Sequence, residues 1–258
     1  MPTFNIHDFG AAGDAVTPDT RAIQAAIDAC HTAGGGLVVV PAGRKYLTGT
    51  VALKSGVGLH VEGDATILAS DRREDYPDES LPCLIAARGA DRVSITGTGV
   101  IDGRAKAYVT EELPHIYRTA LWRPRLIGLV GCTRVAVRDI AIRDAPFWSL
   151  HLIGCEDVLI HGITILNDLK MPNADGIDPD HCRRVRITDC YIEAGDDCIV
   201  LKNTAAFAWC GPCEDIAVSG CTLVSTSAAI KIGTESVDDF RRITVEGCTI
   251  RQSHRGVS

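Results

Sequence analysis

The amino-acid sequence predicts an all-β fold, namely a right-handed single-stranded parallel β-helix with an N-terminal capping α-helix. Two observations lead to this prediction. A short motif recurs along the second half of the 258-residue chain, and aromatic residues make up only 5% of a sequence that holds 25 glycines. Such a composition is typical of short strands joined by frequent turns. We expect a single domain spanning residues 1–258.

The first element in order is an amphipathic helix from Thr20 to Ala33. It follows two candidate capping residues, Asp19 and Thr20, and the three glycines 34–36 end it. Its apolar face is built from residues at helical spacing: Ile23, Ala26, Ile27 and Cys30. The first coil of a solenoid exposes apolar surface and strand edges, and we expect this helix to cover them. The apolar run 37–40, stopped by Pro41, is predicted as the first buried strand.

The recurring motif is the strongest indication of the fold. It has five clear copies, at residues 131–142, 154–165, 181–192, 212–223 and 239–250, and a weaker copy begins at Gly89. The anchor positions 132, 155, 182, 213 and 240 lie 23, 27, 31 and 27 residues apart. A unit of about 20–30 residues with short strands and no internal helix fits one turn of a parallel β-helix.

Alternation within each copy predicts which side chains point inward. The anchor and the residues three, five, eight and ten positions after it are apolar in every copy. Cys190, Cys221 and Cys248 occupy the same phase in successive copies, so we expect them to stack as an internal ladder. The Cys210-Gly-Pro-Cys213 segment has metal-ligand or redox spacing, but a second matching pair is missing and no βαβ pattern surrounds it, which favours a structural role.

Charge and hydropathy exclude several classes of partner. The chain has 26 basic and 33 acidic residues, a net charge of −7, which argues against nucleic acid and anionic membranes. No apolar run approaches the roughly 18 residues that a membrane span requires. We expect no membrane association, and the sequence leaves the oligomeric state open.

The cysteine count and the two ends of the sequence bear on the cellular compartment of the protein and on the extent of its β-helix. Eleven cysteines is an odd number, and the first residues show no signal-peptide pattern, so we expect a cytoplasmic protein. A secreted or periplasmic protein with its signal removed is the alternative. The sequence stops at Ser258, just after a strand pattern. We expect C-terminal coils to be missing, although another chain could instead cover the last coil.

Two acidic segments stand out from an otherwise solvated polar surface. The first is residues 173–180, Asn-Ala-Asp-Gly-Ile-Asp-Pro-Asp, and the second is residues 193–202, which contain Asp196 and Asp197. Asp175 and Asp196 are 196 − 175 = 21 residues apart, close to one coil. We therefore expect them on neighbouring rungs, roughly 4.8 Å apart along the axis.

Three carboxylates at one site would repel each other, which raises the pKa of at least one of them. One protonated and one ionised carboxyl are what glycoside hydrolysis requires, the first to protonate the leaving oxygen and the second to activate water or attack the sugar. A Ca²⁺ site is the rival interpretation of such a cluster, because hard cations also prefer several carboxylate oxygens. We predict catalysis by Asp175, Asp196 and Asp197, with no cofactor and no bound metal.

At these two segments the sequence resembles a known family. Residues 173–178 and 195–202 are similar to the Asn-Thr-Asp-Gly and Gly/Gln-Asp-Asp motifs of the polygalacturonases and their relatives in glycoside hydrolase family 28. The opening segments 8–14, 19–24 and 34–43 also resemble that family, together with other pectin-degrading and phage tail-spike β-helices. The resemblance covers nearly the whole chain, and the two aspartate motifs are its specific part.

The resemblance implies an inverting mechanism on galacturonate-containing, pectic carbohydrate. In it, Asp196 matches the general acid, and Asp175 with Asp197 matches the pair that activates water. Two family features are absent: Ser227-Ala228-Ala229 stands where the family has Gly-His-Gly, and the usual Arg-Ile-Lys would begin at Ser258, the last residue. Cations for substrate carboxylates must then come from elsewhere, and Lys202, Lys231 and Arg255 are the candidates.

Further side chains are expected to contact the substrate. Trp148 and His151 lie about one coil before Asp175, and a sugar often packs on an aromatic face; ordinary packing is the alternative for Trp148, and a hydrogen-bonded wall position for His151. Asn173 and Glu235 complete the predicted binding set. The leading hypothesis is a glycosidase. A calcium-dependent polysaccharide lyase and a non-catalytic carbohydrate-binding β-helix remain as alternatives.

Overall fold

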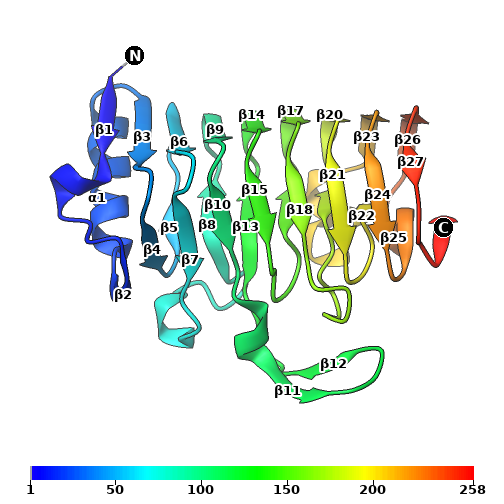
Figure 1. The fold of residues 1–258 in the computed structure, drawn as a ribbon. Coiled ribbons are helices and arrows are strands. Elements are labelled where there is room, and N and C mark those ends of the chain that lie inside the picture. The colour runs from blue at the N-terminus through cyan, green and yellow to red at the C-terminus, as the bar shows by residue number, and fades with distance from the viewer. Residues whose placement is uncertain (1) are drawn as a thin grey trace.

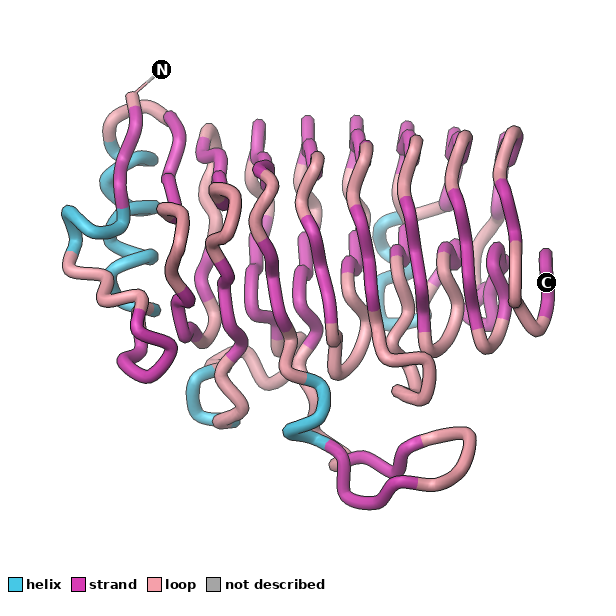
Figure 2. The backbone as a smooth tube through the Cα atoms, viewed as in Figure 1, coloured by secondary structure: helices cyan, strands magenta, loops and turns pink. Residues whose placement is uncertain are grey.

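The computed structural model describes residues 2–258 and shows a stack of coils wound into three parallel sheets (Figure 1). The predicted parallel β-helix with an N-terminal capping helix is confirmed. Figure 2 shows how the strands of successive coils line up along the stack, with loops at the corners. We call the sheets A, B and C.

Sheet A has nine strands, in the spatial order in which the chain visits them. They are β1 (Thr3–Asn5), β3 (Gly36–Val40), β6 (Val57–Val61), β9 (Asp91–Gly97), β14 (Thr133–Arg138), β17 (Glu156–His161), β20 (Arg183–Thr188), β23 (Cys213–Ser219) and β26 (Phe240–Glu246). Sheet B also has nine: β2 (Asp14–Pro18), β4 (Lys45–Thr48), β7 (Thr66–Ala69), β10 (Val100–Asp102), β15 (Ala141–Arg143), β18 (Thr164–Leu166), β21 (Tyr191–Ala194), β24 (Thr222–Ser225) and β27 (Thr249–Ile250).

Sheet C has eight strands and carries the candidate site. They are β5 (Val51–Ala52), β8 (Cys83–Arg88), β13 (Arg125–Val130), β16 (Leu150–Ile153), β19 (Ile177–Asp180), β22 (Ile199–Asn203), β25 (Ala228–Ser236) and β28 (Arg255–Val257). Outside the three sheets lie a hairpin and four 3-10 segments: β11 (Val109–Glu112), β12 (Tyr117–Thr119), η1 (Ile6–Phe9), η2 (Arg73–Asp75), η3 (Ala105–Tyr108) and η4 (Ala205–Cys210).

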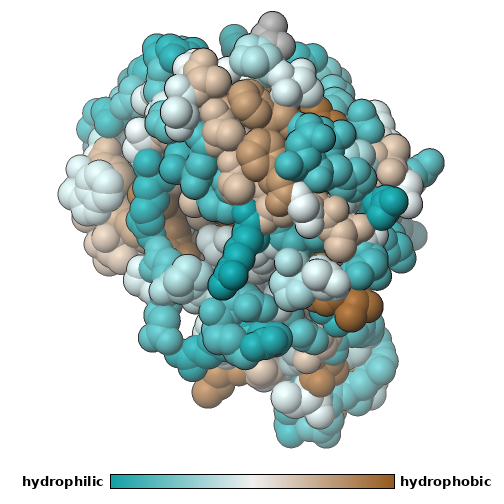
Figure 3. Space-filling model, turned by 90° about the vertical axis from the view of Figure 1, so that its left-hand side faces the viewer, coloured by the Kyte–Doolittle hydropathy of each residue, from teal (hydrophilic) through white to brown (hydrophobic). Residues whose placement is uncertain are grey.

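Helix α1 (Thr20–Thr32) covers the N-terminal end of the stack and buries the predicted face. Seen from that end, polar residues surround a smaller apolar area (Figure 3). The side chain of Asp19 makes no capping hydrogen bond to the helix. Its carboxylate instead accepts from the backbone N–H groups of Ala12 (2.6 Å) and Gly13 (3.1 Å), so it fixes the preceding loop. Sequence reasoning also missed β1 and β2, which are short and mostly not buried.

The repeat positions behave as predicted in the first four copies. All five inward positions of the copy anchored at Cys155 are buried, and the same holds for the copies anchored at Cys132, Cys182 and Cys213. Equivalent residues pair in register, for example Ile142 with Ile165 and Ile165 with Ile192. The fold therefore rests on columns of identical or similar side chains.

The turn between sheets A and B explains which residues occur at the position seven residues after the anchor of each copy. In each of the five copies the residue seven positions after the anchor has a positive φ, between 56° and 66°. Only Gly, Asn and Asp adopt this left-handed conformation readily. The sequence supplies them at every corner: Asp139, Gly162, Asp189, Gly220 and Gly247.

The cysteines are core residues. All eleven are free, and ten of them are buried, with Cys248 half-buried in the last coil. Cys213 lies in the main core, and Cys210 packs with Val130 and Ile153 in a smaller cluster. These positions agree with a packing role for the Cys210–Cys213 segment.

Replacement of one column residue measures how much the stack contributes to stability. Ile165 is fully buried between Ile142 and Ile192, so Ile165→Ala should lower the free energy of unfolding by about 2–5 kcal/mol through lost burial and a residual cavity. The next residue, Leu166, is 41% exposed, and Leu166→Ala serves as the matched control, with an expected change within about 0.5 kcal/mol. Guanidinium denaturation of both variants checks this; equal losses would contradict the column model of the core.

The segment between β10 and β13 leaves the stack of coils and then contacts the loop between β18 and β19. It carries the β11–β12 hairpin, which projects from the body (Figure 1). The Lys106 ammonium lies 2.8 Å from Asp168, and the Tyr117 N–H donates to the Lys170 carbonyl at 2.9 Å. These contacts hold the loop that leads directly into residues 173–175 of the candidate site.

Candidate active site

The three predicted catalytic aspartates lie in turns that lead from sheet B into sheet C. Asp175 comes just before β19, and Asp196 and Asp197 come just before β22. The Gly176 N–H donates to the Asp197 carbonyl at 2.9 Å, so the two turns lie on adjacent coils, as the 21-residue spacing predicts. The parallel stack thus brings all three residues to one edge of sheet C.

Asp175 is buried beside a second acid. Its side chain is 3% exposed, and Asp178, on β19, is fully buried. Burial, followed by the charges of Asp178 and Asp196, raises the pKa of Asp175 well above its ordinary value. Burial also raises the pKa of Asp178 to about 7, against the opposing effect of Lys202. This pair of carboxyls therefore holds a proton at pH values where an exposed aspartate is ionised.

Asp196 and Asp197 have different surroundings. Asp196 is half-buried, and its carboxylate accepts from the Asn173 N–H at 3.3 Å. Burial and, next, the neighbouring Asp197 charge raise the pKa of Asp196. Asp197 is 2% exposed and accepts from the Ala228 N–H (3.0 Å) and the Lys231 ammonium (2.8 Å). The turn thus contains one carboxyl with a raised pKa, Asp196, beside one that is ion-paired to a lysine, Asp197.

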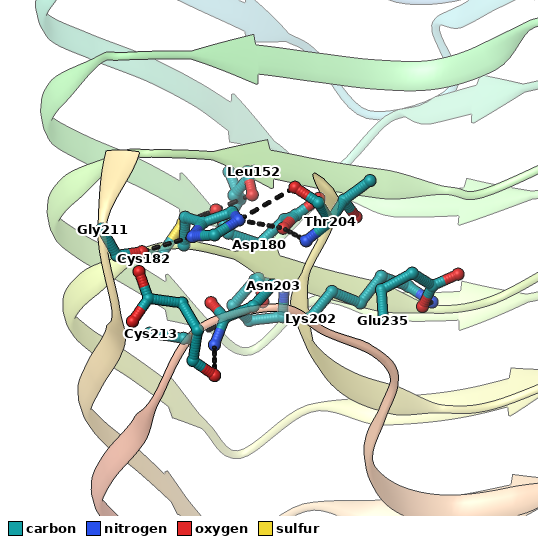
Figure 4. Close-up of polar contacts among 12 residues, drawn as sticks. Leu152, Asp180, Cys182, Lys202, Asn203, Thr204, Gly211, Cys213 and Glu235 are labelled. Carbon is teal, nitrogen blue, oxygen red and sulfur yellow. Dashed lines mark hydrogen bonds and ion pairs between the residues drawn. The ribbon is translucent and has the colours of Figure 1, made fainter. Parts of the chain in front are cut away.

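Lys202 is a buried cation on β22, 4% exposed. Its ammonium lies 3.1 Å from Glu235 and 3.8 Å from Asp178, and in Figure 4 its side chain extends beside Glu235. Burial alone would lower the pKa of Lys202, but the charges of Asp178, Asp175 and Glu235 outweigh it and raise the pKa. Lys202 is therefore a counter-charge to the acids of the site.

Two cations lie close to the Trp148 ring. The Lys202 ammonium lies 4.5 Å from the centre of its ring, and the Arg125 guanidinium carbon lies 4.7 Å away. The indole also meets the His151 ring edge-on, at 4.6 Å between centroids. These neighbours give Trp148 a packing role, and its predicted contact with a sugar stays a prediction.

His151 is a buried wall residue. It is 1% exposed, its Nε2 lies 3.2 Å from Asp180 Oδ2, and its Nδ1 has no partner within residues 2–258. Burial lowers the pKa of His151 to about 4, so the ring is neutral near pH 7 and Nε2 donates to Asp180. Asp180 also accepts from the Thr204 N–H at 2.9 Å and so anchors the start of η4 (Figure 4).

The remaining two predicted residues differ in position. Asn173 contributes its backbone N–H to Asp196, while its side-chain oxygen accepts from Arg123 at 2.9 Å. Arg123 also donates to the carbonyls of Pro146 (2.8 Å) and Pro172 (2.6 Å), and these hydrogen bonds stabilise the turn that contains Asn173. Arg255, on the exposed last strand, contacts the Ser258 hydroxyl at 3.4 Å and none of the three aspartates.

Sequence reasoning did not select three residues that the structure adds to the site: Asp178, Asp180 and Arg125. Both aspartates lie within the 173–180 motif and could have been recognised there. Arg125 precedes Trp148 by 148 − 125 = 23 residues, which equals the first repeat spacing. The periodicity of the sequence therefore predicts that Arg125 and Trp148 are neighbours on adjacent coils.

Within residues 2–258, no group of three or more His, Cys, Asp or Glu side chains is arranged to hold a metal ion. The same part of the chain contains no helix with the length and apolar character of a membrane span. A surface hollow of about 490 Å³ lies on sheet A beside Gly35, Gly58 and Arg134, away from the three aspartates.

Comparison with known proteins places the chain in a family. Residues 30–258 match the family described as Glycosyl hydrolases family 28. A probable polygalacturonase of Vitis vinifera is 32% identical over 97% of this chain and 55% of its own length. An exopolygalacturonase of Zea mays is 26% identical over 99% of this chain and 61% of its own.

A solved structure agrees with these sequence matches. The hyperthermoactive exopolygalacturonase of Thermotoga maritima superposes with a TM-score of 0.88 at 27% identity, over 99% of this chain and 68% of its own. The chain spans a little over half the length of the two plant relatives. On the family match, the sequence identity and the shared β-helix, this chain belongs to family 28 of the glycosyl hydrolases.

Proposed function

We propose that the chain hydrolyses glycosidic bonds in galacturonate-containing, pectic oligo- or polysaccharides by an inverting mechanism that uses Asp175, Asp196 and Asp197. Membership of the family and the names of its relatives support the reaction class. The observation that carries the residue assignment is the contrast within one turn: Asp196 has a raised pKa, and Asp197 is ion-paired to Lys231.

In this mechanism Asp196 is the general acid. A carboxyl with a raised pKa stays protonated at a higher pH and can donate to the oxygen of the departing sugar. The Asn173 N–H on its carboxylate orients the group and stabilises the charge left after proton transfer.

Asp175 and Asp197 act on the attacking water. The Lys231 contact fixes Asp197 as a carboxylate acceptor for a water proton. The raised pKa of Asp175 makes it a stronger base once it is ionised, and the Lys202 charge nearby favours that ionised form. Asp175 and Asp197 lie on adjacent coils, so a water molecule between them would be hydrogen-bonded to both carboxyls.

The pH dependence follows from these assignments. Catalysis requires Asp196 to be protonated, so kcat/KM should fall as pH rises through the raised pKa of Asp196. Lys231 lowers that pKa, so Lys231→Met should move the falling limb to higher pH. Profiles of kcat/KM against pH check this, with Lys54→Met as a control on an exposed lysine. A limb that stays in place in Lys231→Met would contradict the coupling.

A product assay tests the function itself. Pectic oligosaccharides are incubated with the chain, and new reducing ends and ultraviolet absorbance are measured with and without a chelator. The proposal predicts saturated products that form with the chelator present. Unsaturated products lost to the chelator would point to a lyase, and binding without any product would point to a non-catalytic β-helix; either result overturns the proposal.

A further inference from the structure

The Arg125 guanidinium lacks a partner in a site where other cations have one. Arg125 begins β13, and its guanidinium lies against Trp148 (4.7 Å) and Phe147 (5.1 Å). Its Nε is buried without a hydrogen-bond partner, and within residues 2–258 its side chain forms no ion pair or hydrogen bond. Burial lowers the pKa of Arg125, and the charges of Cys83 and the nearby acids Asp178, Asp180 and Asp175 only partly offset that effect.

The other cations of the site are already engaged. Lys231 is paired with Asp197 at 2.8 Å, and Lys202 with Glu235 at 3.1 Å. Arg123 donates to two carbonyls and to the Asn173 side chain. The two lysines predicted to bind a substrate carboxylate thus each contact an acid of the protein, and their contact with the substrate stays a prediction.

Arg125 also stands at a suitable place on the stack. The Leu126 N–H donates to the Trp148 carbonyl, and the Ser149 N–H donates to the Asp175 carbonyl. Arg125 thus lies two rungs from Asp175 on the same edge of sheet C, roughly 10 Å along the axis at about 4.8 Å per rung. A carbohydrate lying along the stack across Asp175 would also pass Arg125.

The chemistry of the side chain selects the ligand. A guanidinium presents a planar fork of N–H donors that matches the two oxygens of a carboxylate. The contacts with the two aromatic rings restrict the motion of the guanidinium, which reduces the entropy lost on binding. Resting on the proposed function, we propose that Arg125 is a specificity-determining residue that binds the carboxylate of a galacturonate unit and discriminates against its methyl ester.

Calorimetry on non-hydrolysing protein tests this inference. In an Asp196→Asn background, trigalacturonate and its methyl ester are titrated into the parent and into Arg125→Gln, Arg125→Lys and Arg138→Gln versions. Arg138 is an exposed arginine on sheet A and is the matched control. Thermal unfolding confirms that each protein is folded.

Arg125→Gln should weaken binding of the acid roughly ten- to hundredfold, the usual effect of losing a hydrogen bond to a charged group, and change binding of the ester by less than about twofold. Arg125→Lys should lie between, and Arg138→Gln should match the parent. Equal loss of acid and ester binding, or no loss of either, would show that Arg125 only packs against Trp148 and would overturn the inference.

The outcomes separate this inference from the proposed function. If the wild-type chain releases saturated product but Arg125→Gln keeps the parent's acid preference, the role of Arg125 is wrong and hydrolysis stands. If the wild-type chain releases no product while binding of the acid still depends on Arg125, the proposed hydrolysis is wrong and the binding role of Arg125 stands. A parent that binds neither ligand contradicts both.

Discussion

Asp196→Asn should reduce turnover of pectic oligosaccharides by about 10²–10⁴-fold, the usual contribution of a general acid, while leaving the fold intact. The amide has nearly the same shape as the carboxyl, and the side chain is only half-buried, so little packing is lost. The amide cannot supply the proton that the leaving oxygen requires. Reducing-end release and thermal unfolding, measured on the same preparation, check both parts of the expectation.

Asp139→Asn is the matched control. Asp139 is exposed on the corner between sheets A and B, with φ of 62°, a conformation that asparagine also tolerates. It should keep full activity and stability. Turnover by Asp196→Asn at the wild-type rate would show that another group protonates the leaving sugar.

Lys202→Met should destabilise the fold by about 3–5 kcal/mol near neutral pH. Removing one partner of a buried ion pair leaves the other charge uncompensated. Lys202 is 4% exposed and faces Asp178, which is fully buried, as well as Glu235. Methionine keeps most of the volume, so the loss reports the missing charge. Chemical denaturation measures it.

The size of that loss should depend on pH. Asp178 binds a proton more tightly in the folded chain, with a pKa of about 7, than in the unfolded chain, near 3.8. Stability contributed by this group therefore falls as pH rises between those values. Without Lys202 the pKa of Asp178 in the folded chain rises further. The stability of Lys202→Met then keeps falling at pH values where that of the wild type has levelled off. The difference in stability between the two proteins should therefore grow from about pH 6 to about pH 9.

An exposed ion pair provides the comparison. Lys54 lies 2.7 Å from Asp28, with both side chains close to half exposed, and Lys54→Met should cost less than about 1 kcal/mol at any pH in that range. A Lys202→Met deficit as small as this, or one that does not vary with pH, would contradict the buried cluster as the source of the effect.

The fold could be predicted from sequence because one coil is specified locally and then repeated. The inward positions follow from alternation, and the stack makes them core residues wherever a coil lies on both sides. The fifth copy departs from this for a physical reason. In the last coil Val245 is 41% and Ile250 is 38% exposed, since no further coil covers them within residues 2–258.

The site could be predicted only in part. Periodicity brings Asp175, Asp196 and Asp197 to one edge, because coil length sets which residues become neighbours. It does not show which charges pair: the contacts of Lys202 with Glu235 and of Lys231 with Asp197 emerge only from the structure, and the predicted contact of both lysines with the substrate stays a prediction. Such pairing depends on side-chain direction and burial, which only the assembled coils define.

The most direct test of the three-aspartate mechanism is proton NMR recorded while the wild-type chain acts on galacturonate oligosaccharides. The signals of the first-formed product report its anomeric configuration, and a double bond would give separate signals. The three-aspartate inverting mechanism predicts a saturated product that first appears with the anomeric configuration opposite to that of the cleaved bond. A first product with retained configuration, or an unsaturated one, would contradict it.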